Sequence, residues 1–293
     1  MLAYQAPILA LIFTTLSSFT LLDVNALDHK RKGERPKGTT SQTGDAKGKM
    51  HQRLGESLRG AFFARRYELS AMIARGFYET GLRPVYPQNL NCPRANSFFG
   101  ETTRGNGTFR SRRFYAGRHG GMDIPARDIP IIAVANGEVV EKSVGEGIGG
   151  IRVVLRHSPE DTGLDHWTFT EYKHLAQDSH LALHARVEKG QPVGMAGNTG
   201  TTYGRAYGPD GHYHLHLSAW YNATGEVIQT RRALVPDDGY WLDPLALMLG
   251  GPLPSEAIRH LSADEKKVRF AYMTEDGNTH PIGAKVVWPF VCR

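Results

Sequence analysis

Short apolar runs separated by glycine-containing turns dominate the chain from residue 92 to residue 248. Runs of β-branched and aromatic residues between turn signals are typical of short antiparallel strands. The expected strands cover residues 131–134, 138–142, 151–155, 167–172, 192–195 and 212–219. In the third of them, Val153 and Leu155 alternate with Val154 and two arginines, which favours a sheet with one face better covered than the other. The pattern predicts a mainly β (α+β) protein built on an antiparallel β-sheet.

Apolar residues at helical spacing occur in the segment before this region. The apolar side chains that fall at that spacing are Leu58, Phe62, Leu69, Met72, Ile73 and Phe77. We therefore expect one or two helices that end near Gly81 and Pro84, in a helical segment at residues 56–91. A C-terminal extension, residues 250–293, contains a helix candidate at 254–260 and strand candidates at 268–273 and 285–291. The sequence leaves open whether this extension completes an edge of the sheet or forms a small appendage.

The N-terminus reads as an export signal. An apolar stretch at 8–22 is followed by small residues up to Ala26, so residues 1–26 are expected to be a signal peptide. An uncleaved membrane anchor is the alternative, because no Lys or Arg precedes the apolar stretch. Residues 27–55 are rich in Lys, Arg, Gly, Thr and Ser, which is typical of a basic flexible linker or pro-segment. We expect an exported, periplasmic or extracellular protein with no stable membrane insertion after signal cleavage.

Composition is that of a globular protein, with 40% hydrophobic and 22% charged residues among 293. A formal net charge of +6 favours a polyanionic partner, but the chain has no nucleic-acid-binding signature, so no nucleic acid is expected. Cys92 and Cys292 are the only cysteines. In an oxidising compartment they would form an intramolecular disulfide that contributes about 4–5 kcal/mol, and two buried free thiols are the alternative.

Three histidines alternate in the last expected strand: His212, His214 and His216. Alternate side chains of a strand share a face, so the imidazoles would point one way while Leu215 and Leu217 point into the opposite layer. Neighbouring imidazoles on one face can serve one metal site, one as a ligand and another as a catalytic base. This strand is therefore expected to have a metal or catalytic role.

A second candidate pair is His119 and Asp123. The intervening Gly120 and Gly121 disfavour a helix, so a glycine-permitted bend would have to bring the two side chains together. Imidazole and carboxylate are both good zinc ligands, and three protein ligands with one open position define a catalytic zinc. Taken alone, this spacing arises more often by chance than from metal binding.

Together these motifs resemble those of the LytM and lysostaphin-like metallopeptidases, the M23 family. The motifs that carry the resemblance are His119-x-x-x-Asp123, Tyr172-x-His174-Leu175 and His214-x-His216, together with Ala135-Asn136-Gly137-Glu138-Val139 and Gly197-Asn198-Thr199-Gly200. The resemblance covers about half of the chain and implies an M23-like zinc peptidase domain at residues 92–249.

The resemblance also implies roles for five residues. His119, Asp123 and His216 would bind one Zn²⁺ ion, and His174 and His214 would be the catalytic histidines. Zinc lowers the pKa of bound water towards about 7 and polarises the scissile carbonyl, while a neutral imidazole can accept the proton of the water and deliver it to the leaving amine. The sequence contains no His-Glu-x-x-His, so histidine must replace the glutamate base of that common motif.

Two stretches depart from the family pattern. Residues 201–211 look like an insertion that would form a groove wall, and Leu217-Ser218-Ala219-Trp220 replaces the usual aromatic and acidic continuation, which leaves substrate preference open. His157 is expected to be structural. His212 is either a third same-face neighbour or part of the groove rim.

The function expected from the resemblance is that of a cell-wall-associated zinc metalloendopeptidase that hydrolyses peptide cross-links or bridges in bacterial peptidoglycan. Two alternatives remain: a non-catalytic cell-wall-binding activator of other hydrolases, and a secreted zinc protease that acts on proteins or small peptides. A regulatory hypothesis is that the region before Cys92 covers the groove until export or cleavage frees it.

Overall fold

A computed structural model of the chain describes residues 56–144, 149–201, 212–230, 233–250 and 255–293. The expected signal peptide at 1–26 and linker at 27–55 lie outside the described residues, as do positions 202–211 of the expected insertion. Among the helices within these ranges, none has the length and hydrophobicity that crossing a membrane requires.

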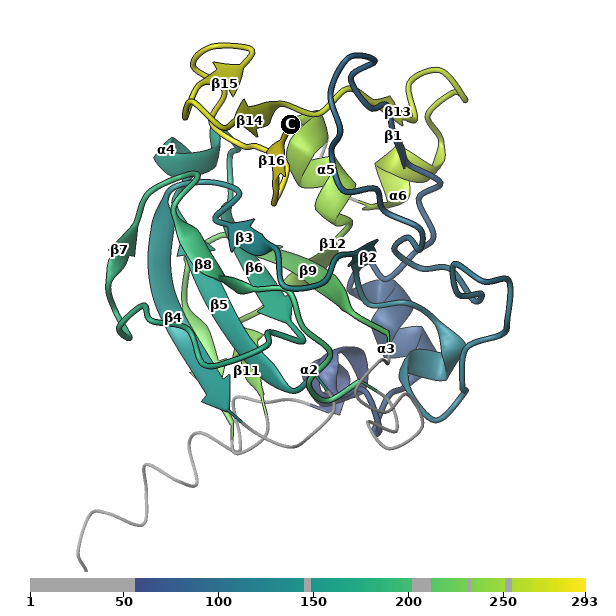
Figure 1. Cartoon of the computed structure of the whole chain (residues 1–293). Coiled ribbons are helices and arrows are strands. Elements are labelled where there is room, and N and C mark those ends of the chain that lie inside the picture. The colour runs from purple at the N-terminus through teal and green to yellow at the C-terminus, as the bar shows by residue number, and fades with distance from the viewer. Residues whose placement is uncertain (1–55, 145–148, 202–211, 231–232, 251–254) are drawn as a thin grey trace, which may run out of the picture. The chain divides into compact units, whose positions relative to one another are not determined.

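The main sheet has seven strands in the order β12-β9-β6-β5-β4-β7, with β2 also paired to β9 (Figure 1). Its strands are β2 (Met122–Pro125), β4 (Gly137–Val144), β5 (Ile151–His157), β6 (Trp167–Lys173), β7 (Arg186–Val187), β9 (His214–Asn222) and β12 (Tyr240–Leu242). Every pairing in this sheet is antiparallel. The predicted mainly β architecture around an antiparallel sheet is confirmed.

Smaller sheets and short helices surround the main sheet. The remaining strands are β1 (Arg83–Pro84), β3 (Pro130–Ile132), β8 (Pro192–Met195), β10 (Val227–Gln229), β11 (Leu234–Pro236), β13 (Lys267–Val268), β14 (Tyr272–Thr274), β15 (Thr279–His280) and β16 (Val291–Cys292). The helices are α2 (Glu56–Phe62), α3 (Leu69–Ala74), α4 (Pro159–Thr162), α5 (Pro244–Leu249), α6 (Ser255–Arg259) and the 3-10 turn η1 (Tyr115–Gly117).

The C-terminal extension does not complete an edge of the main sheet. Strand β14 lies between β15 and β16 in a separate three-stranded sheet, and β13 pairs with β1. The strands are shorter than the sequence predicted, because Trp288 and Phe290 fill the hydrophobic core instead of continuing a ladder. The extension is thus packed into the fold through its side chains.

Both faces of the main sheet are covered. Alternate residues of one strand enter different hydrophobic clusters, as the period of two requires: Val153 and Leu155 belong to the larger cluster, and Val154 belongs to the smaller. The prediction that one face is better covered than the other is confirmed at this strand. Val153 and Leu155 are fully buried on the first face, whereas Arg152 and Arg156 on the second are only half-buried. Helices α2 and α3 cover that second face with Leu58 and Met72.

The helical segment is part of the second core. Trp241 of β12 stacks on Phe62 of α2 with ring centroids 5.3 Å apart, and its Nε1 donates a hydrogen bond to the carbonyl of Ala61. Phe77, just after α3, packs edge-on against the same indole at 4.7 Å. A chain that begins near residue 91 would lose these contacts, so truncation there would test folding rather than release of a cover.

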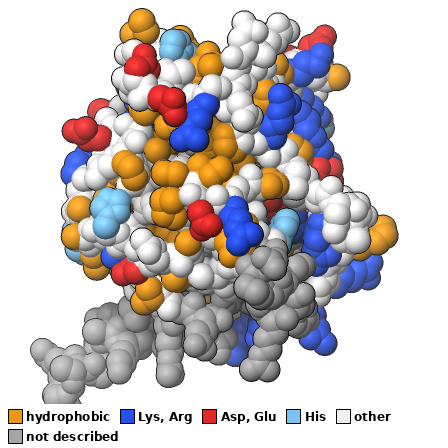
Figure 2. Space-filling view, viewed as in Figure 1, with side chains coloured by type: hydrophobic (Ala, Val, Ile, Leu, Met, Phe, Trp, Pro, Cys, Tyr) orange, Lys and Arg blue, Asp and Glu red, His pale blue; other side chains and the backbone are white. Residues whose placement is uncertain are grey.

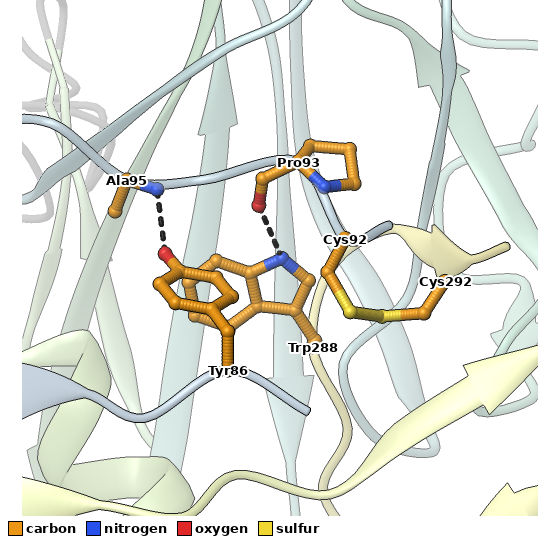
Figure 3. Close-up of a disulfide and its surroundings, with 6 residues drawn as sticks. All are labelled: Tyr86, Cys92, Pro93, Ala95, Trp288 and Cys292. Atoms are coloured by element: carbon orange, nitrogen blue, oxygen red, sulfur yellow. Dashed lines mark hydrogen bonds between the residues drawn. A yellow bond between two sulfur atoms is a disulfide. The ribbon is translucent and has the colours of Figure 1, made fainter. Parts of the chain in front are cut away.

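Cys92 and Cys292 form a disulfide between residues 200 positions apart in the sequence (Figure 3). The bond is buried beside Trp288, whose Nε1 donates a hydrogen bond of 3.0 Å to the carbonyl of Pro93. The backbone N–H of Ala95 donates to the hydroxyl of Tyr86 at 2.7 Å. The disulfide therefore ties the C-terminal extension to the start of the segment that leads into the sheet.

Replacing both cysteines, Cys92→Ser with Cys292→Ser, is expected to lower the free energy of unfolding by about 5 kcal/mol, because the bond closes a very long loop in the unfolded chain. Urea unfolding followed by tryptophan fluorescence would measure the change. The native chain in dithiothreitol is the matched control and should unfold at the urea concentration of the variant. Coincident unfolding of oxidised native chain and double variant would contradict the prediction.

Candidate active site

The pairing of β2 with β9 sets the position of the first candidate residues. Asp123 lies directly opposite His216 in the antiparallel register. Gly121 immediately precedes β2, and a Cβ atom there would lie 2.3 Å from the carbonyl oxygen of Leu217. The close approach of this segment to β9 therefore requires glycine. The expected glycine-permitted bend is present at Gly120 and Gly121, and Asp123 follows it in strand β2.

His119, Asp123 and His216 come together at one point. His119 Nε2 lies 3.0 Å from Asp123 Oδ1 and 3.1 Å from His216 Nδ1. His216 Nδ1 lies 2.8 Å from the same carboxylate oxygen. The side chains are 3%, 9% and 13% exposed for His119, Asp123 and His216, so the cluster lies at the bottom of a depression rather than on an open surface.

The three facing atoms fit one zinc ion. Ligands at about 2.0–2.1 Å around a tetrahedral zinc lie about 3.3 Å from one another, close to the separations of 2.8 to 3.1 Å between these atoms. The other ring nitrogens are also oriented: His119 Nδ1 lies 3.0 Å from the carbonyl of Phe98, and His216 Nε2 lies 3.1 Å from Ser218 Oγ. The carbonyl of Phe98 only accepts, so it holds the Nδ1–H of His119, and Nε2, which contacts Asp123, is the nitrogen that a metal ion would bind.

Arg110 holds the other oxygen of the candidate carboxylate ligand. Its Nη2 lies 3.3 Å from Asp123 Oδ2 and also donates to Ser97 Oγ. Its Nε donates to the carbonyl of Thr103 at 3.1 Å. Oδ1 of Asp123 is thereby left facing the two imidazoles. Sequence reasoning missed Arg110 and Ser97, since neither belongs to a spaced motif.

The charge states also suit a cation. Burial alone would raise the pKa of Asp123, but the nearby His119 and His214 and the hydrogen bonds of His119 and His216 hold the pKa well below its usual range. Burial lowers the pKa of His216 to about 3, although Asp123 acts in the opposite direction. An ionised carboxylate beside a neutral imidazole is the protonation state in which both bind metal.

His174 and His214 lie beside this cluster with their rings 4.6 Å apart. His174 Nδ1 lies 2.7 Å from the carbonyl of Thr199, and His214 Nδ1 lies 3.0 Å from the carbonyl of His212. Both imidazoles therefore carry their proton on Nδ1 and leave Nε2 as the acceptor. His214 Nε2 lies 3.6 Å from Asp123 Oδ1, so this free nitrogen faces the candidate metal position.

The backbone around His174 is unusual. His174 has φ +64°, in the left-handed region that non-glycine residues seldom adopt. Thr199 stabilises this turn, because its carbonyl accepts from the imidazole and its hydroxyl donates to the carbonyl of Leu175 at 2.6 Å. Burial, together with His214 and His216, lowers the pKa of His174 well below its usual range, so the ring is neutral and able to accept a proton.

Two further histidines differ in their surroundings. His157 is fully buried between the carbonyl of Asn136 and the hydroxyl of Thr170, and burial lowers its pKa to about 4; these contacts are structural ones. His212 lies before β9 and is exposed. It approaches Asp123 and His214 closely enough for a second metal group, but the separation of 3.6 Å between Asp123 and His214 and the exposure of His212 favour the buried set.

A cavity of about 440 Å³ opens over the cluster and includes all five candidate residues in its wall. Gly149, Gly200 and Thr201 border it on the side of His174. Arg104, Asn106 and Tyr115 come from the segment between β1 and β2. A cavity of this size admits a short stretch of extended peptide. The rest of the predicted groove wall, at 202–211, lies outside the described residues.

Part of the chain matches a known family of peptidases. The model of Peptidase family M23 matches residues 117–228, the segment that carries all five candidate residues. The resemblance inferred from the motifs is thus confirmed over residues 117–228, the part of the chain that is similar to Peptidase family M23. A comparison with curated proteins gives no match.

Solved structures resemble parts of the chain. The catalytic domain of the antimicrobial peptidase lysostaphin from Staphylococcus simulans is 24% identical, over 37% of this chain and 71% of that one, with a TM-score of 0.30. The catalytic domain of the prophage-encoded M23 protein EnpA from Enterococcus faecalis is 17% identical over 47% and 85%, with a TM-score of 0.31. A zinc containing peptidase from Vibrio cholerae is 20% identical over 50% and 35%, with a TM-score of 0.29.

Proposed function

We propose that the chain is a zinc-dependent endopeptidase that hydrolyses peptide cross-links or bridges in bacterial peptidoglycan. In this proposal His119, Asp123 and His216 hold one zinc ion, and His174 and His214 are the catalytic histidines. The observation that carries it is the convergence of three ligand atoms, from β9, from β2 and from the residues just before β2, beside two imidazoles with free Nε2 atoms.

In each of the two catalytic histidines, Nδ1 orients the ring and Nε2 takes part in proton transfer. A bound zinc ion would supply a Lewis acid for the scissile carbonyl and lower the pKa of a water molecule at its open position. His174 and His214 keep Nδ1 on backbone carbonyls, so Nε2 takes the proton of the attacking water and passes it to the leaving amine. Because these contacts fix the tautomer of each ring, neither imidazole has to rotate or change tautomer before it accepts a proton.

Several features support a cell-wall substrate in an exported protein. The motifs resemble those of LytM and lysostaphin-like peptidases, and residues 117–228 match the family model. The buried disulfide between Cys92 and Cys292 suits an oxidising compartment such as the periplasm or the extracellular space. The net charge of +6 suits an anionic polymer.

The two alternative functions make different demands on the site. A non-catalytic activator has no need of two catalytic imidazoles with free acceptors, and both are present here. A secreted protease acting on proteins would use the same site, so only its substrates separate it from a cell-wall enzyme.

Digestion of purified sacculi tests the proposal. The zinc-loaded chain should release muropeptides whose masses identify a hydrolysed amide bond, and it should leave casein largely intact. Removal of metal with a chelator should stop the release, and added zinc should restore it. Release of casein peptides without muropeptides would favour the protease alternative, and inactivity on both substrates with a full complement of zinc would favour the activator.

A further inference from the structure

Cationic side chains line the wall of the candidate active site. Those in the cavity that holds the candidate metal residues are Arg104, Arg110, Arg118 and Lys173. An adjoining cavity of about 500 Å³ shares Tyr115 and Lys173 with the first and adds Arg65, Arg66 and Arg152. Figure 2 shows Lys and Arg side chains gathered on the side of the molecule where Figure 1 has the segment between β1 and β2. The two cavities thus form one strongly basic depression.

The carboxylates in this depression already have cationic partners. Asp123 pairs with Arg110. Glu171 lies 2.7 Å from Lys173 and 3.4 Å from Arg152.

Four arginines remain without a carboxylate within 4.0 Å in the part of the chain that the structure describes. These residues, the arginine rim, are Arg65, Arg66, Arg104 and Arg118. Among the described residues, therefore, no carboxylate neutralises the positive charge of the rim locally.

Two members of the rim are only half exposed. Arg118 makes one long hydrogen bond, 3.4 Å, to the carbonyl of Gly100. Arg104 donates to Thr108 and to the carbonyl of Phe109. A guanidinium has five N–H donors in a planar fork that matches a carboxylate. Partly buried guanidiniums with neutral acceptors gain most from an anionic ligand, because a charge-assisted pair is stronger than a hydrogen bond to a carbonyl.

We propose that the arginine rim binds free carboxylates of the peptide substrate, so that the site selects acidic peptides over neutral ones such as glycine bridges. This inference rests on the proposed function and narrows its substrate class. Arg104 and Arg118 line the same cavity as His119 and His214, so a carboxylate bound there lies on a residue close to the scissile bond. Arg65 and Arg66 extend the attraction along the adjoining cavity.

A matched pair of substrates tests this inference. Cross-linked muropeptides from sacculi are used in native form and after carbodiimide coupling with ammonia, which converts their carboxylates to carboxamides. The native form should have a kcat/KM at least about tenfold higher, since one charge-assisted pair contributes about a factor of ten or more. Arg104→Gln and Arg118→Gln should each reduce that preference through KM, with zinc content unchanged.

Arg269→Gln is the charge-matched control, because Arg269 is exposed in the C-terminal extension and lines neither cavity. It should leave the preference intact. Equal kcat/KM of the native chain for the two substrates would overturn the inference while leaving the proposed function in place. So would a loss of preference in Arg269→Gln as large as that in Arg104→Gln and Arg118→Gln.

If neither substrate is cleaved, the proposed function fails, and binding to the metal-free chain still decides the inference. Fluorescence anisotropy of the two forms, coupled to an uncharged dye, would then have to show tighter binding of the native form. Equal affinities would overturn the role of the rim.

Discussion

His216→Ala is expected to abolish both zinc binding and hydrolysis of peptidoglycan. His216 Nδ1 lies 2.8 Å from Asp123 and 3.1 Å from His119, so its loss leaves one imidazole and one carboxylate at the proposed metal position. The lost Lewis acid is worth several kcal/mol, so activity should fall by about a thousandfold or more. Elemental analysis of the purified protein should find about one zinc ion per native chain and almost none in the variant.

The control for this prediction is His180→Ala. His180 is exposed and does not line the cavity, so the variant should keep the zinc content and activity of the native chain. Circular dichroism should show that His216→Ala retains the β-rich fold, because its side chain is at the cavity and outside both hydrophobic clusters. Equal amounts of tightly bound zinc in native chain and His216→Ala would show that the ligand set is wrong.

The β9 strand was predictable because its sequence has a strict period of two. Leu215 and Leu217 are fully buried in the larger cluster, while His214 and His216 face the cavity. A strand with leucines on one face and imidazoles on the other has only one orientation that buries the leucines. β9 begins at His214, and His212 before it is exposed in the wall of the cavity, in keeping with the alternative that it belongs to the groove rim.

The partner strand of β9 was harder to predict. β2 has four residues and follows two glycines, so neither length nor propensity marks it as a strand. Its conformation is set by pairing with β9, about ninety residues later in the sequence, in a register that places Asp123 opposite His216. The motif predicted which residues meet, and only the tertiary structure reveals that a β-ladder holds them.

Supporting contacts made by the backbone had no sequence signal. The carbonyls of Phe98, Thr199 and His212 fix the tautomers of three imidazoles, and every residue type offers a carbonyl. Arg110 comes from an irregular segment without periodicity, so its approach to Asp123 could not be read from spacing. The Gly197-Asn198-Thr199-Gly200 motif was noticed through the family resemblance, while its use as the acceptor for His174 appears only in the structure.

The packing of the helical segment was only half predictable. Its apolar stripe indicated helices, and α2 and α3 are present. The surface that they cover, around Trp241, depends on side chains from β12, which the sequence pattern did not reveal as a strand. Amphipathic spacing indicates that a helix face is buried, whereas the identity of its partner depends on topology.

His214→Gln and His174→Gln are expected to keep the zinc and lose the chemistry. Each imidazole presents a free Nε2 to the cavity, and a side-chain amide can occupy similar space but cannot act as a base at neutral pH. Loss of a general acid or base lowers rates by about 10²–10⁴-fold, so kcat on muropeptides should fall by that range while zinc stays at about one ion per chain.

The zinc content of the variants distinguishes a catalytic role of His214 from a role as a metal ligand. Asp123, His212 and His214 also lie close enough to hold an ion. If that group were the metal site, His214→Gln would lose zinc together with activity, and His216→Ala would keep it.

The double variant of His174 and His214 adds a second test: when two groups serve one sequence of proton transfers, their losses are not additive. The kcat of the double variant should therefore lie close to that of the less active single variant. A loss in kcat equal to the product of the two single losses would indicate that the histidines act independently.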